Sequence, residues 1–296
     1  MDLGFTTPWK MVTSNDGSRL YVVNNIGQYV SVIDTSNDSL ITTVPVGNNA
    51  KGIAISPDDS TLYVTNYSQN TVSVIDTATN TVSSTIGGAT TSDGIAVSPD
   101  GTRLYVSLYA PNILKVFDTS NNSLLSTIGT GSYPSSITIS PDRSRFYVPM
   151  LGYNIVSIYD GNTNANIGSA NTGAFPFESV LSSDGGTLYV TNIQATTISM
   201  INTSTNASTT IQLGSGNNPH GIALSPDDNV LYVTIPSTDQ VAILDVDPTS
   251  ANYLSIDSMV SVGDKPHYAT MSPSGEYVYI SNELDNTVTA LCTVAP

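Results

Sequence analysis

The amino-acid sequence predicts an all-β fold: a seven-bladed β-propeller of four-stranded antiparallel blades. Two observations carry this prediction. The chain of 296 residues contains seven similar units, repeated at a spacing of about 42 residues. Each unit holds four short runs rich in β-branched residues, separated by turns of Asp, Asn and Gly. Four short strands in each repeat of this length are typical of one propeller blade.

The seven units follow one another without a linker, so residues 1–296 are expected to form a single propeller domain. The predicted blades cover residues 6–47, 48–89, 90–131, 132–173, 174–216, 217–263 and 264–296. The last unit supplies only three strands, and residues 1–5 align with the end of a fourth. We therefore expect the N-terminal residues, from Asp2 to Phe5, to complete the last blade, which would remove the open sheet edges of a linear array.

Composition limits the partners that the protein can bind. The formal net charge is -16, from 24 acidic and 8 basic residues, which opposes attraction to nucleic acid and to anionic lipid. No apolar run approaches the roughly 18 residues that span a bilayer, so no membrane insertion is expected.

The start of the sequence lacks a signal-like pattern, which leaves a cytoplasmic location or secretion with the signal removed. The single cysteine, Cys292, excludes an internal disulfide, and we expect a monomer.

Two identical copies of one short motif allow the repeat to be compared with a known family. They are Tyr63-Val64-Thr65-Asn66 and Tyr189-Val190-Thr191-Asn192, and the runs Ser56-Pro57-Asp58 and Val74-Ile75-Asp76-Thr77 accompany the first copy. These runs resemble the blade of the YVTN family of β-propeller repeat proteins, and the resemblance covers essentially the whole chain. It implies the propeller architecture. It implies less about activity, because propellers of this kind serve as surface proteins, binding modules, lactonases and lyases.

Residues that recur at one offset in most units are expected to serve the blade itself. One such set is predicted to pack between blades: Tyr21, Tyr63, Tyr105, Tyr147, Tyr189, Tyr232 and Tyr279. Another set is predicted to cap turns: Asp58, Asp100, Asp142, Asp184 and Asp227 after the first strand, and Asp34, Asp76, Asp118, Asp160 and Asp245 after the third. Much of the negative charge is therefore turn chemistry. Cys292 occupies the position in the last unit that Asp76 occupies in the second, which argues against a catalytic thiol.

Residues that break the repeat gather on one face, which we call the upper face. It carries the loops that lead into each first strand and the loops between the second and third strands. The first ring, just before each first strand, reads Trp9, Lys51, Asp93, Ser135, Phe177, His220 and His267. The second ring, one residue later, reads Lys10, Gly52, Gly94, Ser136, Glu178, Gly221 and Tyr268. Ligand sites in propellers usually lie where this face meets the central channel.

The mouth of the channel is therefore predicted to bind a small organic ligand with apolar parts. The predicted substrate-binding residues are Trp9, Lys51, Asp93, Tyr109, Met150, Phe177, Glu178 and Tyr268. The alternative is that Trp9, Met150 and Phe177 simply plug the channel.

Proton transfer is the chemistry that the two histidines favour, because imidazole titrates near neutral pH. The predicted catalytic residues are His220 and His267 as proton carriers, Glu283 as the group that orients one of them, and Lys10 as a stabiliser of negative charge. The alternative is that the Pro-His pairs at both positions are copies of inherited repeat sequence. A direct ion pair between Lys10 and Glu178 stays open, since their blades lie far apart around the ring.

The funnel also resembles that of the streptogramin B lyases, whose histidines lie about one blade apart with carboxylates that hold Mg²⁺. His220, His267 and Glu283 match in order and approximate spacing. The resemblance implies a second carboxylate just before the later histidine, where this chain has Lys265 two residues before it. Because a cation disfavours Mg²⁺ at the same place, the expectation is acid–base chemistry without a metal or other cofactor, with Mg²⁺ as the alternative.

Two classes of function remain open. The first is an enzyme of the lyase, isomerase, cyclase or lactonase type that acts on a small molecule in the funnel. The second is a non-catalytic module that binds a protein or glycan partner with the same face, as surface-layer proteins do. The sequence has no phosphate-binding glycine loop, no zinc cluster of Cys and His, and no Gly-x-Ser-x-Gly elbow, which excludes the common plans for nucleotide hydrolysis, structural zinc and serine hydrolysis.

Overall fold

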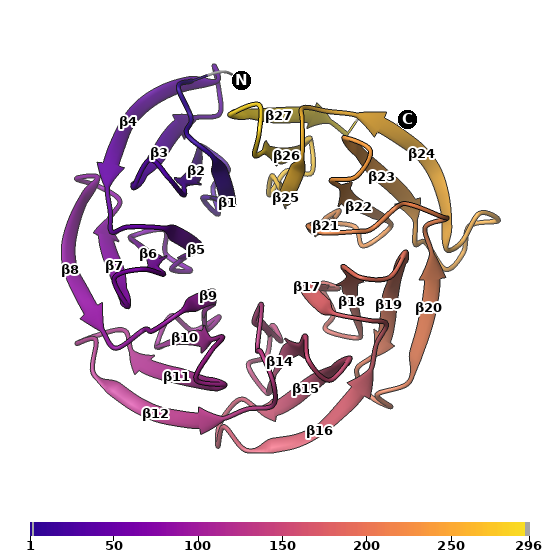
Figure 1. Cartoon of the computed structure of the whole chain (residues 1–296), viewed down its shortest axis with the longest axis horizontal. Coiled ribbons are helices and arrows are strands. Elements are labelled where there is room, and N and C mark those ends of the chain that lie inside the picture. Colours follow the sequence, from indigo (N-terminus) through magenta and orange to yellow (C-terminus); the bar gives the residue numbers. More distant parts are fainter. Residues whose placement is uncertain (2, 294–296) are drawn as a thin grey trace.

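The computed structural model of the chain describes residues 1 and 3–293. These residues form seven antiparallel sheets that stand as blades around a central axis (Figure 1). Six sheets have four strands and the seventh has three. Sequential strands pair in every blade, and the first strand of each lies nearest the axis (Figure 1). The predicted all-β, seven-bladed fold is confirmed.

The strands follow the predicted repeat. Blades one to three contain β1 (Pro8–Thr13), β2 (Arg19–Asn24), β3 (Tyr29–Asp34), β4 (Ser39–Pro45), β5 (Ala50–Ile55), β6 (Thr61–Asn66), β7 (Thr71–Asp76), β8 (Thr81–Gly87), β9 (Ser92–Val97), β10 (Arg103–Leu108), β11 (Ile113–Asp118) and β12 (Leu124–Gly129). Blades four and five contain β13 (Thr138–Ile139), β14 (Arg145–Met150), β15 (Ile155–Asp160), β16 (Asn166–Asn171), β17 (Pro176–Leu181), β18 (Thr187–Asn192), β19 (Thr197–Asn202) and β20 (Ser208–Gln212). Blades six and seven contain β21 (Ile222–Leu224), β22 (Val230–Ile235), β23 (Gln240–Asp245), β24 (Ser255–Ser261), β25 (Pro266–Met271), β26 (Tyr277–Asn282) and β27 (Thr287–Cys292).

The turns between the first and second strands lie on the face opposite the upper face, which we call the lower face. Aspartate caps hold these turns, as the sequence predicted. Asp58 is representative: its carboxylate accepts hydrogen bonds from the Ser56 hydroxyl at 2.6 Å and from the backbone N–H of Ser60 at 3.1 Å. The hydroxyls of Ser56 and Ser60 and this N–H hold the pKa of Asp58 below its ordinary value. The same cap recurs at the equivalent turns, so these carboxylates serve the blades.

The core lies between neighbouring blades. Tyr105 of β10 packs against Phe146 of β14, with ring centroids 4.9 Å apart, and Phe146 stacks on Tyr159 of β15 at 4.8 Å. The repeated tyrosines are all buried. Side chains that interlock across each blade interface therefore hold the blades at a fixed angle around the axis.

The two ends of the chain meet at blade seven. The backbone of Met1 exchanges hydrogen bonds with that of Val288 in β27, at 2.6 and 3.1 Å. Phe5 is 4% exposed and packs with Tyr279 and Val288. The sheet itself has three strands in the part of the chain that the structure describes, and Asp2 lies outside the described residues, so a complete fourth strand stays a prediction.

A second repeated feature, a residue with a positive φ, shapes the loops of the upper face. The residue two positions before each first-ring residue has a positive φ in six blades: Thr7, Asn49, Thr91, Tyr133, Phe175 and Lys265, with φ from 50° to 58°. At Tyr133 the backbone N–H donates to Asn112 Oδ1 at 2.9 Å, and the carbonyl accepts from Leu151 N–H at 3.1 Å. The first of these hydrogen bonds ties blade four to blade three, and equivalent bonds at Thr7, Phe175 and Lys265 tie their blades to the preceding ones. They help to maintain a backbone conformation that side chains other than Asn, Asp and Gly rarely adopt.

Across residues 1 and 3–293, the structure contains no helix with the length and apolar character needed to cross a membrane.

Candidate functional site

Both histidines meet at the mouth of the channel. His220 precedes β21 and His267 lies in β25, and their ring centroids are 3.7 Å apart. Trp9 from β1 lies 4.0 Å from His267, and Phe177 from β17 lies 4.4 Å from His220, between ring centroids. Tyr268 packs edge-on against His220 at 5.4 Å. The structure thus assembles residues from blades one, five, six and seven into one cluster, which we call the histidine cluster: Trp9, Phe177, His220, His267 and Tyr268.

One hydrogen bond determines the tautomer of His220. Its Nδ1 lies 3.0 Å from the carbonyl oxygen of His267. A carbonyl oxygen only accepts, so Nδ1 carries the proton of the neutral ring, and Nε2 is left as the acceptor with a free lone pair. Burial lowers the pKa of His220 to about 4, against smaller opposing effects of the His267 carbonyl and Asp93. His220 is therefore neutral at pH 7.

His267 is enclosed more tightly. It is 7% exposed, and its Nδ1 is buried without a hydrogen-bond partner among the described residues. Its Nε2 lies 3.7 Å from Glu283 Oε2, too far for a direct hydrogen bond. Burial and the adjacent His220 lower its pKa well below the ordinary range.

Glu283 has a closer partner than either histidine. Its Oε2 lies 2.8 Å from Lys265 Nζ. Glu283 therefore sits beside His267 as predicted, but the carboxylate is engaged by the lysine that the sequence comparison with the lyases had singled out. Whether Glu283 orients His267 stays a prediction.

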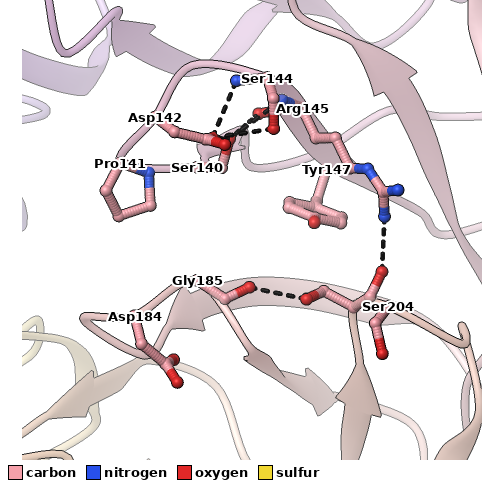
Figure 2. Close-up of a pocket in the computed structure, with 10 residues that line it drawn as sticks. Ser140, Pro141, Asp142, Ser144, Arg145, Tyr147, Asp184, Gly185 and Ser204 are labelled. Carbon is pink, nitrogen blue, oxygen red and sulfur yellow. Dashed lines mark hydrogen bonds between the residues drawn. The ribbon is translucent and has the colours of Figure 1, made fainter.

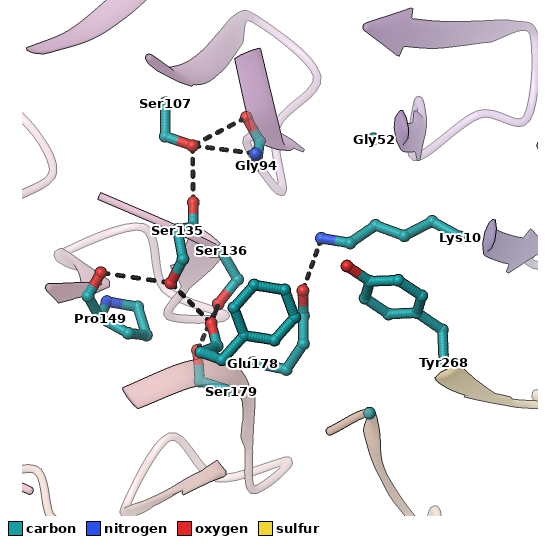
Figure 3. Close-up of polar contacts among 12 residues, drawn as sticks. Lys10, Gly52, Gly94, Ser107, Ser135, Ser136, Pro149, Glu178, Ser179 and Tyr268 are labelled. Carbon is teal, nitrogen blue, oxygen red and sulfur yellow. Dashed lines mark hydrogen bonds and ion pairs between the residues drawn. The ribbon is translucent and has the colours of Figure 1, made fainter. Parts of the chain in front are cut away.

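Lys10 and Glu178 form an ion pair across the channel, with Nζ and Oε1 2.6 Å apart (Figure 3). Their side chains are 13% and 15% exposed. Burial lowers the pKa of Lys10, but Glu178 and Asp93 more than offset this, so the pKa lies above its ordinary value. Burial, together with the nearby Asp93 charge, raises the pKa of Glu178 by more than Lys10 lowers it. The pairing that the sequence left open is thus present, and it is a largely buried bridge rather than an exposed surface contact.

A cavity of about 160 Å³ lies along the channel next to this bridge. Its polar lining comes from Lys10, Glu178, Ser136 and Ser179, and Met11, Ile53, Ile95 and Ile137 are among its apolar walls. Tyr268 also lines it, with a buried hydroxyl that has no hydrogen-bond partner in the described part of the chain. Burial raises the pKa of this phenol well above its ordinary value, so the hydroxyl stays protonated and available as a donor.

Threonine hydroxyls of the second strands position the backbone of both rings. Thr191 accepts from the N–H of Glu178 at 3.1 Å and donates to the carbonyl of His220 at 2.8 Å. Thr234 likewise donates to the carbonyl of His267 at 3.0 Å. Ser107 makes the equivalent contact to Ser135 at 2.6 Å (Figure 3). Each hydroxyl links one blade to the next, which fixes the spacing of the two histidines.

The remaining predicted binding residues are distributed over the upper face. Lys51 Nζ lies over the ring of Tyr67 at 4.4 Å and that of Trp9 at 5.7 Å. Tyr109 stacks on Tyr133, with centroids 4.5 Å apart. Asp93 has a buried Oδ1 without a hydrogen-bond partner in the described residues. Its charge acts on both Lys10 and His220.

Met150 does not join this group. It is 0% exposed and packs in the core between blades three and four with Leu114 and Phe146. Its offset in the repeat is that of Asn66, which is also buried. The alternation of side chains along β14 therefore turns Met150 into the blade interface, away from the mouth.

Larger cavities lie between the blades on the lower face. One of about 340 Å³ separates blades four and five, and Figure 2 shows its lining. Arg145 Nη1 spans it to the carbonyl of Thr203 at 2.6 Å, while Asp142 accepts from Ser140 and Ser144 (Figure 2). Clefts with the same lining recur between blades two and three and between one and two. The carboxylates that line these clefts already cap turns, so we interpret the clefts as structural features of the blades. The residues that depart from the repeat and could carry out chemistry lie at the opposite, upper face.

Sequence reasoning missed two residues near the mouth. Tyr133 was not predicted because it lies outside both rings, although it occupies the position in its unit that Asn49 occupies in the second. Lys265 was placed on the upper face and noted as a departure from the lyases, but it was given no role, and its contact with Glu283 could not be predicted from sequence spacing. The signal for Tyr133 is a bulky residue at a slot where blades one to three have Thr or Asn.

Comparisons with known proteins support the architecture. A model of the family described as lactonase, 7-bladed β-propeller matches residues 131–294, and a model of the YNCE-like β-propeller family matches residues 3–187. No curated protein matches the sequence. Among solved structures, a chain of hydrazine synthase from Kuenenia stuttgartiensis has a TM-score of 0.90 and 23% identity, covering 100% of this chain and 98% of that chain.

At 23% identity, the likeness to the hydrazine synthase chain shows the fold alone. The resemblance to the YVTN repeat proteins stays a prediction. Each of the two family models spans more than half of the sequence. The chain therefore belongs to the seven-bladed β-propellers of the lactonase family and to the YNCE-like β-propellers.

Proposed function

We propose that the mouth of the propeller is an enzyme site that uses acid–base chemistry on a small, partly apolar organic molecule, with hydrolytic opening of a cyclic ester as the reaction class. The lactonase-type family match supports the reaction class. The observation that carries the proposal is the hydrogen bond from His220 Nδ1 to the carbonyl of His267. It presents Nε2 of a neutral imidazole as a proton acceptor inside an aromatic cluster.

In the proposed step, His220 Nε2 takes a proton from water as the water oxygen adds to the ester carbonyl. The resulting oxyanion accepts hydrogen bonds from the protonated Tyr268 hydroxyl and from Lys10, whose raised pKa keeps it charged. Collapse of the intermediate breaks the ring C–O bond, and the imidazolium returns its proton to the leaving alkoxide. Water is consumed and a hydroxy acid is released, so atoms and protons balance.

The surroundings of His220 favour this role over metal chemistry. Trp9 and Phe177 supply apolar walls beside the imidazoles. Lys265 already holds the Glu283 oxygen that a Mg²⁺ ion would require. The proposal therefore needs only side chains of this protein and a water molecule.

The test is hydrolysis of a panel of γ- and δ-lactones by wild type and by His220→Gln, followed by pH titration of the released acid. The variant is expected to lower kcat by about 100-fold or more while the melting temperature is kept. Leu284→Ala serves as the control, because Leu284 follows Glu283 in sequence and its side chain is 60% exposed. Unchanged turnover in His220→Gln would refute the role of His220, and no turnover of any lactone would refute the reaction class.

A second candidate is a non-catalytic binding face, and one observation favours it. The Lys10–Glu178 bridge spans the channel, and the histidine cluster packs tightly beside it. A module that binds a protein or glycan tolerates such a filled channel, whereas an enzyme must admit substrate to His220. Solvent access to Nε2 separates the two, and carbethoxylation of His220 with diethyl pyrocarbonate measures it: rapid modification supports the enzyme, and protection supports the binding module.

A further inference from the structure

A row of tyrosines crosses the upper rim of blades two to four. We call it the tyrosine arc and define it as Tyr67, Tyr109, Tyr133 and Tyr153. Tyr109 and Tyr133 stack with centroids 4.5 Å apart and planes at 18°. Tyr133 is 40% exposed and Tyr153 is 60% exposed. Tyr133 and Tyr153 thus present aromatic surface to solvent, while Tyr109 is partly buried and packs beside Phe177 and Tyr268 of the histidine cluster.

The rings of the arc are held in place before any ligand binds. Tyr153 lies on the backbone of Gly131, where an added Cβ would come within 2.6 Å of its ring carbons. Lys51 Nζ lies over the ring of Tyr67 at 4.4 Å. Rings that are already ordered lose little conformational freedom on binding, which favours affinity.

The backbone of Tyr133 has the conformation that this slot adopts in six blades. Its φ is 58°, a value that costs a bulky residue on the order of 1 kcal/mol or more. The blade hydrogen bonds require this backbone, but they do not require a tyrosine, since Asn49 fills the same slot in blade two with a φ of 56°. Phe175 fills the same slot in blade five with a φ of 57°, so the strain belongs to the blade. Tyr133 differs in its ring, which is 40% exposed and stacked on Tyr109.

Charge determines which ligand the arc suits. Nucleic acid bases also stack on aromatic rings, but the net charge of -16 opposes a polyanion. The phenol hydroxyls and the neighbouring Asn112 supply hydrogen-bonding groups beside the ring faces. Sugar rings combine C–H faces, which pack on the negative face of an aromatic ring, with hydroxyls that bond at its edge. We infer that the tyrosine arc binds a neutral oligosaccharide.

The inference does not depend on proton transfer at His220, so it can fail or succeed separately from the proposed enzyme activity. It is tested by isothermal titration calorimetry of the whole chain with cellohexaose and with maltohexaose. Tyr133→Asn keeps a residue suited to the positive φ and is expected to fold, while weakening binding at least tenfold. Tyr153→Ala is expected to act in the same direction.

Tyr277→Ala is the matched control. Tyr277 is also 40% exposed and stacked on another tyrosine, Tyr279, but it begins β26 at the lower face. Binding is expected to survive in this variant. The inference is overturned if neither hexasaccharide binds wild type, if Tyr133→Asn binds as tightly as wild type, or if heparin binds the arc more tightly than the neutral sugars.

Discussion

Lys10 of blade one and Glu178 of blade five meet across the central channel, with Nζ and Oε1 2.6 Å apart. The two residues are far apart in sequence and lie in blades that do not touch through their strands (Figure 1). A largely buried ion pair of this kind ties opposite sides of the ring together. Tyr268 lies beside the pair, with its ring centroid 4.9 Å from Lys10 Nζ.

Removal of one partner of this bridge is expected to destabilise the protein more than removal of both. Glu178→Gln leaves the largely buried Lys10 ammonium without its paired carboxylate, with only the more weakly acting Asp93 nearby. The expected cost is about 3–5 kcal/mol in the free energy of unfolding. The double variant Lys10→Met with Glu178→Leu is expected to lie much closer to wild type, because neither member of the pair is left without the other. Urea denaturation of the three proteins measures this. Equal losses in the single and double variants would contradict it.

The stability of the protein is expected to fall as the pH drops from about 6.5 to about 4. The pKa of His220 is lowered to about 4 in the folded state, so over this range the unfolded chain binds a proton that the folded chain does not. Protonation therefore favours unfolding, by up to about 3 kcal/mol across the window. The lowered pKa of His267 acts in the same direction.

The contribution of His220 can be isolated by comparison with His220→Gln. Unfolding by urea at pH 7 and at pH 4.5 is expected to show a smaller difference in the variant than in wild type. The two proteins share the aspartate caps, whose lowered pKa values affect stability only at more acidic pH. An identical pH dependence in both proteins would mean that His220 titrates normally.

Thr7 has a φ of 55°, which disfavours a β-branched residue. Thr7→Asn is expected to raise the free energy of unfolding by about 1 kcal/mol, because Asn tolerates this region and keeps the backbone N–H that donates to Asn286 Oδ1 at 2.7 Å. Thermal denaturation checks the change. Thr43→Asn in the exposed part of β4 is the control and is expected to give no gain, since its backbone is extended.

The N-terminal residues are expected to contribute much of the stability of blade seven. Phe5→Ala should lower the free energy of unfolding by about 3–5 kcal/mol, because Phe5 is buried against Tyr279 and Val288. Leu3→Ala, at a partly buried position of the same cluster, should cost less. Chemical denaturation of both variants ranks the two positions. A loss of under 1 kcal/mol for Phe5→Ala would argue that blade seven is stable without the N-terminus.

Local patterns in the sequence were sufficient for the fold. The Ser56-Pro57-Asp58 turn closes through hydrogen bonds between residues two apart, so its structure follows from neighbours in the chain. Strand alternation and repeat length then predicted seven blades, and the offsets predicted which tyrosines pack between them. The presence of both histidines at one mouth also followed, because equivalent positions of successive blades lie side by side.

The pairings within the mouth depended on tertiary structure. Lys10 reaches Glu178 only because the channel is narrow enough for two side chains to span it, and the repeat does not state that width. Glu283 Oε2 lies closer to Lys265 Nζ than to His267 Nε2. The path of the upper loops in space sets these two distances, and the repeat does not state it. Met150 packs in a blade interface because the pleat of β14 directs it there. Sequence alone determined the ring of blades, whereas packing across the ring decided which ionisable groups are buried, paired or left with an unused lone pair.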